Sequence, residues 1–499
     1  MPPQAIIKNL NLGGISESPY VGTGDTENEI RSVFNIVNLD IHTNPGITQP
    51  SRALIKDDSR SDGTLVVNEF CEAGVASPRG NAFMFGENGA VFERRTGGQF
   101  HKITTLTPNS GTAKVYSSHV FEDVIYYVMD NRVGKMDVRT EGNNWGNRND
   151  NFGETPGGGA KQRPSIVIED TLYIGHGNQI SRIRDGVFTA DVGPPISSNY
   201  QITCFGRTDN DLLIGTQVAT GFEEVAATST ILRWNTTSNN TVSRDHVPEP
   251  SINAFLNTDN RVFVSCGYSG SLYVYDGADL VFYRKIHPNA KNTTVLPTSV
   301  ANFSTRPIFG FSSTEVLADS NNSDIFGVTP NLGIYSLAQT AVNYPIVLSM
   351  ENTISPGNRS NIQIGAIVPL LAENKYMVSW KRAIEGGEEV GVDVLGDTYT
   401  SGYFITNYLS VSRDIAQQFG ICKLAVGRDS NYNAQIFTEI NHGSFGEALP
   451  MTDPDPVARL VETKRGAGEA NIMRLMVKLS PDSQGAIPRL EETIINIPR

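Results

Sequence analysis

The sequence predicts an all-β protein, and two observations carry this prediction. Short segments rich in β-branched and aromatic residues alternate with a period of two, as in Val124–Val128, Thr171–Ile174 and Leu272–Tyr275. Gly, Asn or Asp bounds each segment, which is typical of strands joined by tight turns. The best helical candidates, Glu29–Phe34 and Asp414–Phe419, are long enough for only about two turns.

The strands recur as a unit of one apolar strand, a turn containing Gly or Asn, and a second strand. The first strands of these units begin near residues 83, 125, 172, 212, 262, 325 and 376. With insertions, this spacing matches the roughly 40–50 residues of one four-stranded propeller blade. Because a single blade cannot bury both of its faces, the set must close into a ring. We therefore expect a β-propeller of about seven blades. Ile415–Phe437 is either an eighth blade or the ring closure, and a pair of β-sandwiches is the structural alternative.

Composition divides the chain into three expected parts. Residues 1–64 contain little periodic apolar sequence and are expected to form an extended N-terminal arm laid across another body. The β-propeller is expected over residues 65–445. Residues 446–499 are expected to form a small C-terminal β-module, in which Ile472–Leu479 has the pattern of an edge strand with one charged face. The polar, Gly-rich stretch 143–159 is expected to be an exposed loop.

Charge and hydropathy argue against several classes of protein. The 499 residues include 40 Lys and Arg against 53 Asp and Glu, a formal net charge of -13. This balance argues against a general nucleic-acid binder, since phosphate neutralisation needs clustered positive charge. No apolar run approaches the roughly 18 residues of a membrane-spanning helix. The N-terminus shows no secretory signal pattern, so we expect synthesis and folding in the cytoplasm.

No residue pattern specifies a catalytic, cofactor-binding or metal site, and we expect none of these and no cofactor. The seven histidines occur singly, and His42 and His176 are expected to be surface hydrogen-bonding residues rather than ligands. Free buried thiols are expected at the four widely spaced cysteines, Cys71, Cys204, Cys266 and Cys422.

Three further patterns match known sites only in part. Gly153–Lys161 is rich in glycine, as a phosphate loop is. However, no Lys directly follows a Gly at the position that such a loop requires, and no Ser or Thr follows Lys161. The alternating Asn147, Asn149 and Asn151 are not followed by the Glu that closes a calcium loop. Gly267–Ser271 is expected to be a hairpin turn, since a nucleophile elbow needs a strand followed by a helix.

Acidic residues stand at the start of several repeat units, at Asp123, Glu169, Asp211 and Asp259 or Asn260. A polar side chain that recurs in the same turn of each unit is typical of a residue that caps a hairpin. The two catalytic carboxylates of a glycosidase would instead occur in particular units and would break the repeat pattern. We therefore expect that the protein is not an enzyme, and a glycan-active propeller enzyme is the least favoured alternative.

Four segments carry a family resemblance. They are Leu12–Ser18, Asn38–Gly46, Asn68–Ala73 with the following Gly80–Phe92, and Leu460–Leu479. These residues resemble tailed-bacteriophage virion structural proteins that have an N-terminal arm and a β-propeller. The resemblance extends over most of the chain, and the spacing of the blades supports it in the middle.

The resemblance implies a non-enzymatic structural component of the tail, such as a nozzle, hub or tip subunit, located in the virion after synthesis in the host cytoplasm. It implies a homo-oligomeric ring that contacts other tail or portal-adaptor proteins. DNA is then only passing cargo, and negatively charged channel walls would not hold it. The alternative is a receptor-binding protein for host adsorption that uses a propeller face to hold a host surface receptor.

Overall fold

The computed structural model describes most of the chain, and all structural statements below concern these residues. They are 6–10, 29–30, 33–44, 46–137, 148–155, 162–208, 211–219, 228–258, 261–277, 279–287, 290–313, 331–339, 346–356, 361–410, 417–419, 422–427, 431–443, 445–455, 457–464, 468–470 and 472–497. None of the helices in these ranges has the length and hydropathy needed to cross a membrane.

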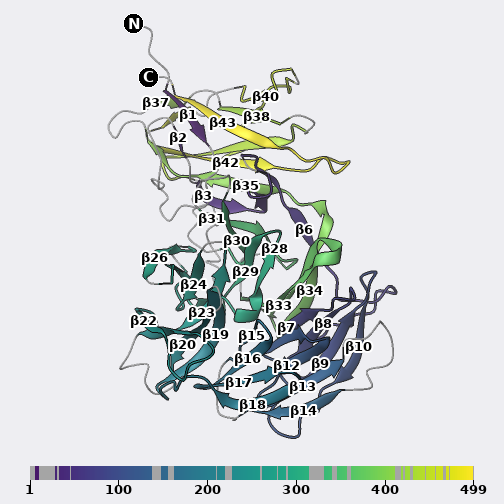
Figure 1. Cartoon of the computed structure of the whole chain (residues 1–499). Coiled ribbons are helices and arrows are strands. Elements are labelled where there is room, and N and C mark those ends of the chain that lie inside the picture. Colours follow the sequence, from purple (N-terminus) through teal and green to yellow (C-terminus); the bar gives the residue numbers. More distant parts are fainter. Residues whose placement is uncertain are drawn as a thin grey trace.

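Five antiparallel sheets follow one another along the described chain, each made of four consecutive strands (Figure 1). The first holds β7 (Cys71–Ala76), β8 (Ala82–Gly86), β9 (Ala90–Arg94) and β10 (Phe100–Thr105). The second holds β11 (Ser117–Phe121), β12 (Val124–Val128), β13 (Arg132–Asp137) and β14 (Asn149–Glu154). The third holds β15 (Ser165–Ile168), β16 (Thr171–His176), β17 (Gln179–Arg184) and β18 (Val187–Val192). The fourth holds β19 (Tyr200–Thr208), β20 (Asp211–Val218), β21 (Ser229–Trp234) and β22 (Ser243–Val247). The fifth holds β23 (Ile252–Asn257), β24 (Val262–Cys266), β25 (Ser271–Tyr275) and β26 (Leu280–Lys285).

Two further sheets continue the series with less regular composition. The sixth holds β27 (Thr293–Thr294), β28 (Val300–Phe303), β29 (Arg306–Ser313), β30 (Gly333–Gln339) and β31 (Ile346–Asn352), with the 3-10 turn η1 (Pro297–Ser299) before β28. The seventh holds β32 (Ile362–Leu370), η3 (Leu371–Glu373), β33 (Lys375–Ile384) and β34 (Gly387–Tyr399). Its fourth strand, β6 (Arg52–Lys56), comes from the start of the chain and pairs with β34 so that Leu54 lies opposite Leu395.

The first strands of these sheets lie around a common axis. Each contacts the first long strand of the next sheet, from β7 through β11, β15, β19 and β23 to β28, and β32 then contacts both β28 and β7. The sheets therefore form a closed circuit. This arrangement confirms the expected all-β fold of propeller type, and the sheet order rules against two separate β-sandwiches.

Side chains join neighbouring sheets of this circuit in two ways. Apolar faces pack together, as where the rings of Phe85 and Tyr127 stack with centroids 5.5 Å apart between the first and second sheets. Near the axis, hydroxyl groups also bridge to the next sheet. Ser379 accepts a hydrogen bond from the Cys71 amide at 3.0 Å, and Ser117 donates to the Arg163 carbonyl at 2.7 Å. Such bridges satisfy backbone groups that the sheet ladders leave unpaired.

A second body, which we call the end module, lies at one end of the elongated molecule and contains the first and the last described strands (Figure 1). One of its sheets holds β3 (Val33–Val37), β35 (Gly402–Thr406), β36 (Leu409–Ser410), β39 (Ala434–Ile440) and β42 (Ile472–Leu479). The other holds β1 (Ile6–Leu10), β2 (Glu29–Ile30), β38 (Cys422–Val426), β40 (Leu460–Glu462) and β43 (Leu490–Ile497). Two small ladders complete it, β4 (Leu39–Asp40) with β5 (Gln49–Pro50) and β37 (Gln417–Phe419) with β41 (Gly468–Ala470).

The strand pairing divides the chain differently from the expected ranges 1–64, 65–445 and 446–499. The described part of the first range is not a separate arm, because β3 pairs with β35 and β6 pairs with β34. Val33 and Ile36 of β3 are fully buried, so this short apolar strand needs the module around it. The described residues between 402 and 440 belong to the end module, and β38 and β39 form neither an eighth blade nor the ring closure.

Two local expectations also change, and a third falls on residues that the structure does not describe. Part of the loop expected at 143–159 is the strand β14, and the remainder of that loop lies outside the described residues except for Arg148 and Thr155. The strand Ile472–Leu479 is central rather than an edge, because β35 and β39 pair with its two sides. The apolar run that predicted the sixth unit, 325–328, lies outside the described residues.

Candidate functional site

Two of the acidic residues at the starts of the repeat units, Asp123 and Glu169, occupy turns, as predicted. Asp123 and Glu169 are exposed and adopt positive φ angles of 56° and 52° in the turns before β12 and β16. Asp211 begins β20 and forms an ion pair with Arg233 at 2.5 Å. Residues 259 and 260 lie outside the described ranges. Two residues of this set therefore lie in turns, and the carboxylate of a third, Asp211, pairs with Arg233 on the neighbouring strand.

The partial motifs also have structural roles where they are described. Gly267–Ser271 is a hairpin turn between β24 and β25, which confirms that prediction. The side chain of Asn149 accepts a hydrogen bond from the Asn151 amide at 3.0 Å, and the Asn151 side chain accepts one from the Asn109 amide at 2.9 Å. Asn147 and residues 156–161 lie outside the described ranges.

The four cysteines are free and buried, as predicted. Burial raises the pKa of each thiol, that of Cys422 to about 12. The thiolate is the reactive form of cysteine, so these side chains act at neutral pH as small apolar groups of the core.

The two histidines expected at the surface are buried instead. His176 is 2% exposed, and its Nε2 lies 2.7 Å from the Ser181 hydroxyl across the β16–β17 hairpin. His42 is 8% exposed, at the boundary between the end module and the sixth sheet. Burial lowers the pKa of each imidazole to about 4, so both are neutral at pH 7. The surface prediction was wrong for both: His176 lies beside a turn, and His42 lies in the segment expected to be an extended arm, and each position suggested exposure.

A group of polar side chains, the junction cluster of Asp40, His42, Arg306 and Glu351, lies where the end module meets the propeller. Arg306 Nε donates to Glu351 Oε1 at 2.7 Å, and Arg306 Nη2 lies 3.9 Å from Asp40 Oδ1. Asp40 Oδ1 also accepts from the amides of His42 and Thr43 at 3.0 and 2.9 Å. Burial would raise the pKa of Asp40, but the charge of Arg306 and these hydrogen bonds outweigh burial and lower it.

A second set of contacts extends the junction along the segment after β5. Arg52 donates to the carbonyls of Gly396 and Asn374, each at 2.8 Å. Buried Asn352 donates to the Arg52 carbonyl at 2.5 Å and accepts from the Tyr376 hydroxyl at 2.6 Å. These bonds join the end of the sixth sheet, the seventh sheet and the strand that completes it.

The apolar core is also continuous across the junction. One buried cluster contains Leu256 of the fifth sheet, Phe309 of the sixth, Tyr376 of the seventh and Phe404 and Ile436 of the end module. The chain crosses between the two bodies twice, after β5 and after β34. Two covalent crossings, a shared core and the junction cluster hold the bodies in one orientation.

The end module has a buried ion pair of its own. Arg474 of β42 and Glu439 of β39 are both fully buried, and Arg474 Nε donates to Glu439 Oε2 at 2.8 Å. The guanidinium lies 4.2 Å from the Tyr408 ring and 5.4 Å from that of Phe34. The alternation in 472–479 predicted a charged outer face, but the aromatic cover places Arg474 in the core.

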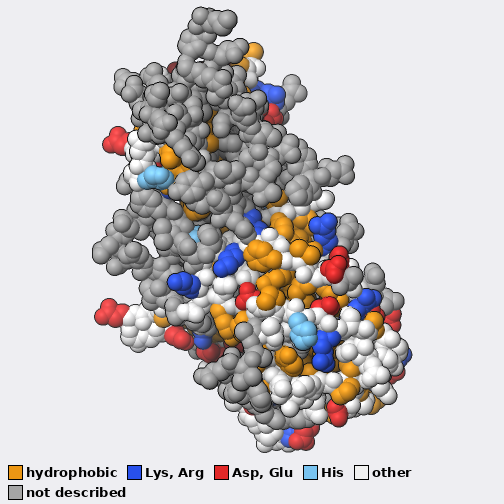
Figure 2. Space-filling model, turned by 90° about the vertical axis from the view of Figure 1, so that its left-hand side faces the viewer, with side chains coloured by type: hydrophobic (Ala, Val, Ile, Leu, Met, Phe, Trp, Pro, Cys, Tyr) orange, Lys and Arg blue, Asp and Glu red, His pale blue; other side chains and the backbone are white. Residues whose placement is uncertain are grey.

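An apolar edge is exposed on the propeller. Val281 and Phe282 of β26, the outermost strand of the fifth sheet, are 61% and 48% exposed. Figure 2 views the molecule from the side on which β26 and β22 lie in Figure 1, and it shows hydrophobic side chains gathered across the middle of this face. Within the described residues, no group of three or more His, Cys, Asp or Glu side chains is placed to hold a metal ion.

No protein-family model matches this chain, and a search of curated proteins found no match. Solved structures resemble it at low identity. The extracellular domain of a hybrid two component system from B. thetaiotaomicron has a TM-score of 0.46 and 15% identity over 81% of this chain. This chain spans 46% of that domain's length. The RRP9 WD40 repeats have a TM-score of 0.45 and 8% identity, covering 70% of this chain and 99% of theirs. The WD40 β-propeller domain of Doa1 has a TM-score of 0.42 and 9% identity, covering 69% and 97%.

Proposed function

We propose that the protein is a non-enzymatic structural component of a bacteriophage tail, a nozzle, hub or tip subunit that assembles into a homo-oligomeric ring. In this proposal the seven successive sheets are the blades of one propeller, and β6 closes it. The resemblance of the sequence segments to virion proteins is its starting point.

The observation that carries the proposal is the connectivity of the two bodies. The propeller, residues 52–399, is inserted between the two halves of the end module, so both chain ends lie in the module. A single flexible linker would let the bodies move relative to each other. Two crossings with a buried junction cluster instead suit a rigid part that transmits force between neighbours in an assembly.

Two surfaces support contacts with other tail or portal-adaptor proteins. Strands β2 and β40 lie at the two edges of one module sheet, and edge strands can pair with strands of a neighbouring subunit. The apolar edge β26 offers a second contact surface on the propeller. If the ring encloses DNA in transit, the net charge of -13 keeps its wall from binding the phosphates.

The test is the composition of purified virions. Quantitative mass spectrometry should find this protein in several copies per particle, and cryo-electron microscopy should locate it in the tail as a ring. Native mass spectrometry of the purified chain should give closed oligomers rather than an open series of sizes. Absence of the protein from purified particles would refute the proposal.

A matched pair of variants links assembly to the junction. Glu351→Ala removes the partner of buried Arg306, whereas Glu388→Ala removes an exposed carboxylate of the seventh sheet. Particles built with the first variant should lose infectivity, and particles built with the second should retain it. Equal infectivity of the two would show that the rigid junction is not needed in the virion.

A further inference from the structure

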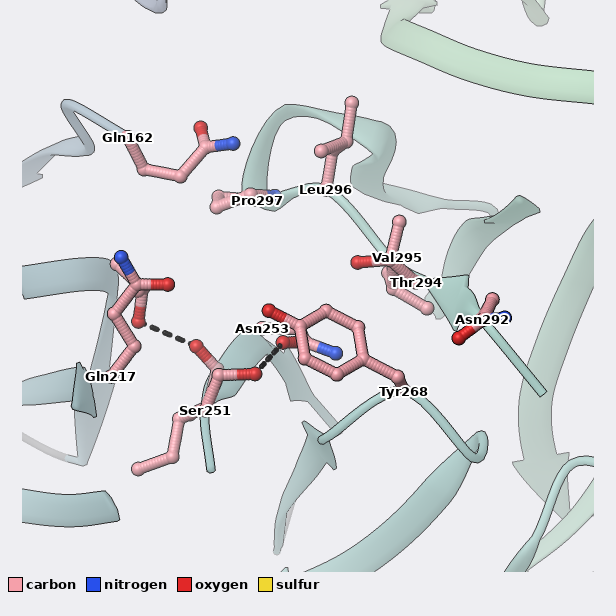
Figure 3. Close-up of a pocket in the computed structure, with 12 residues that line it drawn as sticks. Gln162, Gln217, Ser251, Asn253, Tyr268, Asn292, Thr294, Val295, Leu296 and Pro297 are labelled. Atoms are coloured by element: carbon pink, nitrogen blue, oxygen red, sulfur yellow. Dashed lines mark hydrogen bonds between the residues drawn. The ribbon is translucent and has the colours of Figure 1, made fainter. Parts of the chain in front are cut away.

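A cavity of about 490 Å³ lies at the mouth of the propeller axis, among the fourth, fifth and sixth sheets (Figure 3). Gln217 lies next to the end of β20, Ser251 precedes β23 and Asn253 lies near its start, and Tyr268 lies in the turn between β24 and β25. In Figure 3 these residues face Leu296 and Pro297, which precede β28, across the opening. Its volume is within the roughly 300–1,000 Å³ typical of small-molecule sites.

The lining of this cavity combines apolar side chains with polar side chains that carry no charge. Its residues are Gln162, Thr203, Gln217, Ser251, Ile252, Asn253, Tyr268, Asn292, Thr294, Val295, Leu296 and Pro297. An ionised ligand would find no opposite charge among these side chains and would lose hydration without compensation. Amides and hydroxyls instead offer donors and acceptors that match neutral hydroxyl groups.

Hydrogen bonds hold the polar side chains of the cavity in place. Ser251 Oγ donates to Asn253 Oδ1 at 2.7 Å, and Asn253 Nδ2 donates to the Gly267 carbonyl at 2.6 Å. Gln217 Nε2 donates to Gln201 Oε1 at 3.0 Å, which leaves its second amide hydrogen available. Groups that are already oriented lose less conformational entropy when a ligand binds.

Tyr268 supplies a flat aromatic surface at the rim. The residue is 47% exposed and lies in a turn in which Gly267 and Gly270 adopt positive φ angles of 64° and 68°. The Thr293 amide donates to the Tyr268 carbonyl at 3.0 Å, which ties this turn to the sixth sheet. An aromatic ring above polar amides matches a pyranose, which has an apolar C–H face and a rim of hydroxyls.

We propose that this cavity binds a neutral saccharide of one or two rings, with Tyr268 stacked on a sugar face and the amides bonded to its hydroxyls. The site stands independently of the tail assignment. In a virion protein it would supply a means of holding a neutral surface polysaccharide of the host.

Calorimetric titration of the full chain tests this site. The probes are glucose, galactose, rhamnose, N-acetylglucosamine, maltose and lactose, with glucuronate and N-acetylneuraminate as ionised counterparts. We expect at least one neutral sugar to bind, and we expect the ionised sugars to bind at least about tenfold more weakly. A neutral bacterial surface polysaccharide that competes with this sugar would identify a polymer as the source. Failure to compete would assign the site to free sugars.

Two variants establish where binding occurs. Tyr268→Ala should weaken binding at least about tenfold, whereas Phe282→Ala, which removes a similarly exposed ring from β26, should leave it unchanged. If Tyr268→Ala changes the melting temperature, Gln162→Ala supplies the same test from another part of the lining. The proposal is overturned if no neutral sugar binds, if the ionised sugars bind equally well, or if the cavity variants bind like the unaltered chain.

Discussion

The propeller and the end module build their sheets in opposite ways. In the first five propeller sheets, each strand pairs with a strand adjacent in sequence, as in β11 to β14. In the end module, Val37 pairs with Tyr403 and Lys8 pairs with Ile495, so the two ends of the chain must meet. Local pairing produces a repeat that is visible in the sequence, whereas distant pairing leaves only isolated apolar strands.

The largest expected effect tests whether the end module depends on its buried ion pair. Arg474→Ala leaves the carboxylate of Glu439 buried without its cation, and we expect a loss of about 3–5 kcal/mol in the free energy of unfolding. Replacing both residues, by Arg474→Met with Glu439→Leu, should recover most of this loss because no unpaired charge remains. Urea unfolding followed by circular dichroism measures both.

An exposed ion pair of the same module is the matched control. Lys423 and Glu462 lie 2.6 Å apart with side chains 38% and 31% exposed, so Lys423→Ala should cost less than about 1 kcal/mol. Equal losses in Arg474→Ala and Lys423→Ala would contradict the role given to burial.

The second prediction concerns the one propeller sheet that uses distant pairing. Leu54→Cys combined with Leu395→Cys places two thiols at paired positions of β6 and β34, where antiparallel neighbours are close enough for a disulfide. The oxidised variant should be more stable than its reduced form by about 2–4 kcal/mol, because the bond closes a very long loop in the unfolded chain. Thermal unfolding with and without reductant measures the difference, and no gain on oxidation would contradict this pairing.

The third prediction tests the junction between the two bodies through pH. His42 faces Asp40, Glu351 and Arg306, and burial lowers its pKa from 6.5 to about 4. The unfolded chain therefore binds a proton at a higher pH than the folded chain does. The contribution of neutral His42 to the free energy of unfolding is fully present above pH 6.5 and is lost as the pH falls toward 4. Between pH 7.5 and 4.5 we expect the free energy of unfolding to fall by about 2–3 kcal/mol on this account.

His42→Gln should remove this contribution to the pH dependence of the unfolding free energy. His246→Gln, which alters an exposed histidine of β22, should follow the curve of the unaltered chain. Buried His176 contributes a loss of the same sign, so part of the dependence should remain in His42→Gln. Parallel curves for His42→Gln and the unaltered chain would show that His42 is accessible to solvent.

The repeat could be predicted from sequence because local physics determines it. Val124–Val128 and Leu272–Tyr275 became β12 and β25, since their alternation and flanking turns suffice to define a hairpin. Gly267–Ser271 was predicted as a turn for the same reason. The start of the propeller, by contrast, could not be predicted. The expected start was residue 65, whereas the propeller includes Arg52–Lys56, because nothing in the sequence of this strand indicates that it pairs with β34.

The polar clusters could not be predicted, because they depend on which distant segments meet. Arg474 alternates with apolar neighbours as a surface residue would, and it is covered by aromatic rings from other segments, those of Phe34, Tyr408 and Phe445. The cavity at the propeller mouth likewise combines turns from several sheets. Tyr268 could not be recognised as part of a binding site, because an aromatic residue in a hairpin turn does not by itself indicate a ligand.

The completion of the seventh sheet by β6 sets an order for synthesis. The ribosome releases Arg52–Lys56 early, but the partner strand β34 ends only at Tyr399. Until then the nascent chain carries an open series of sheets with unpaired edges, which are exposed to aggregation. A chain terminated before residue 387 lacks the strand that β6 needs, so premature release yields an open propeller rather than a smaller closed one.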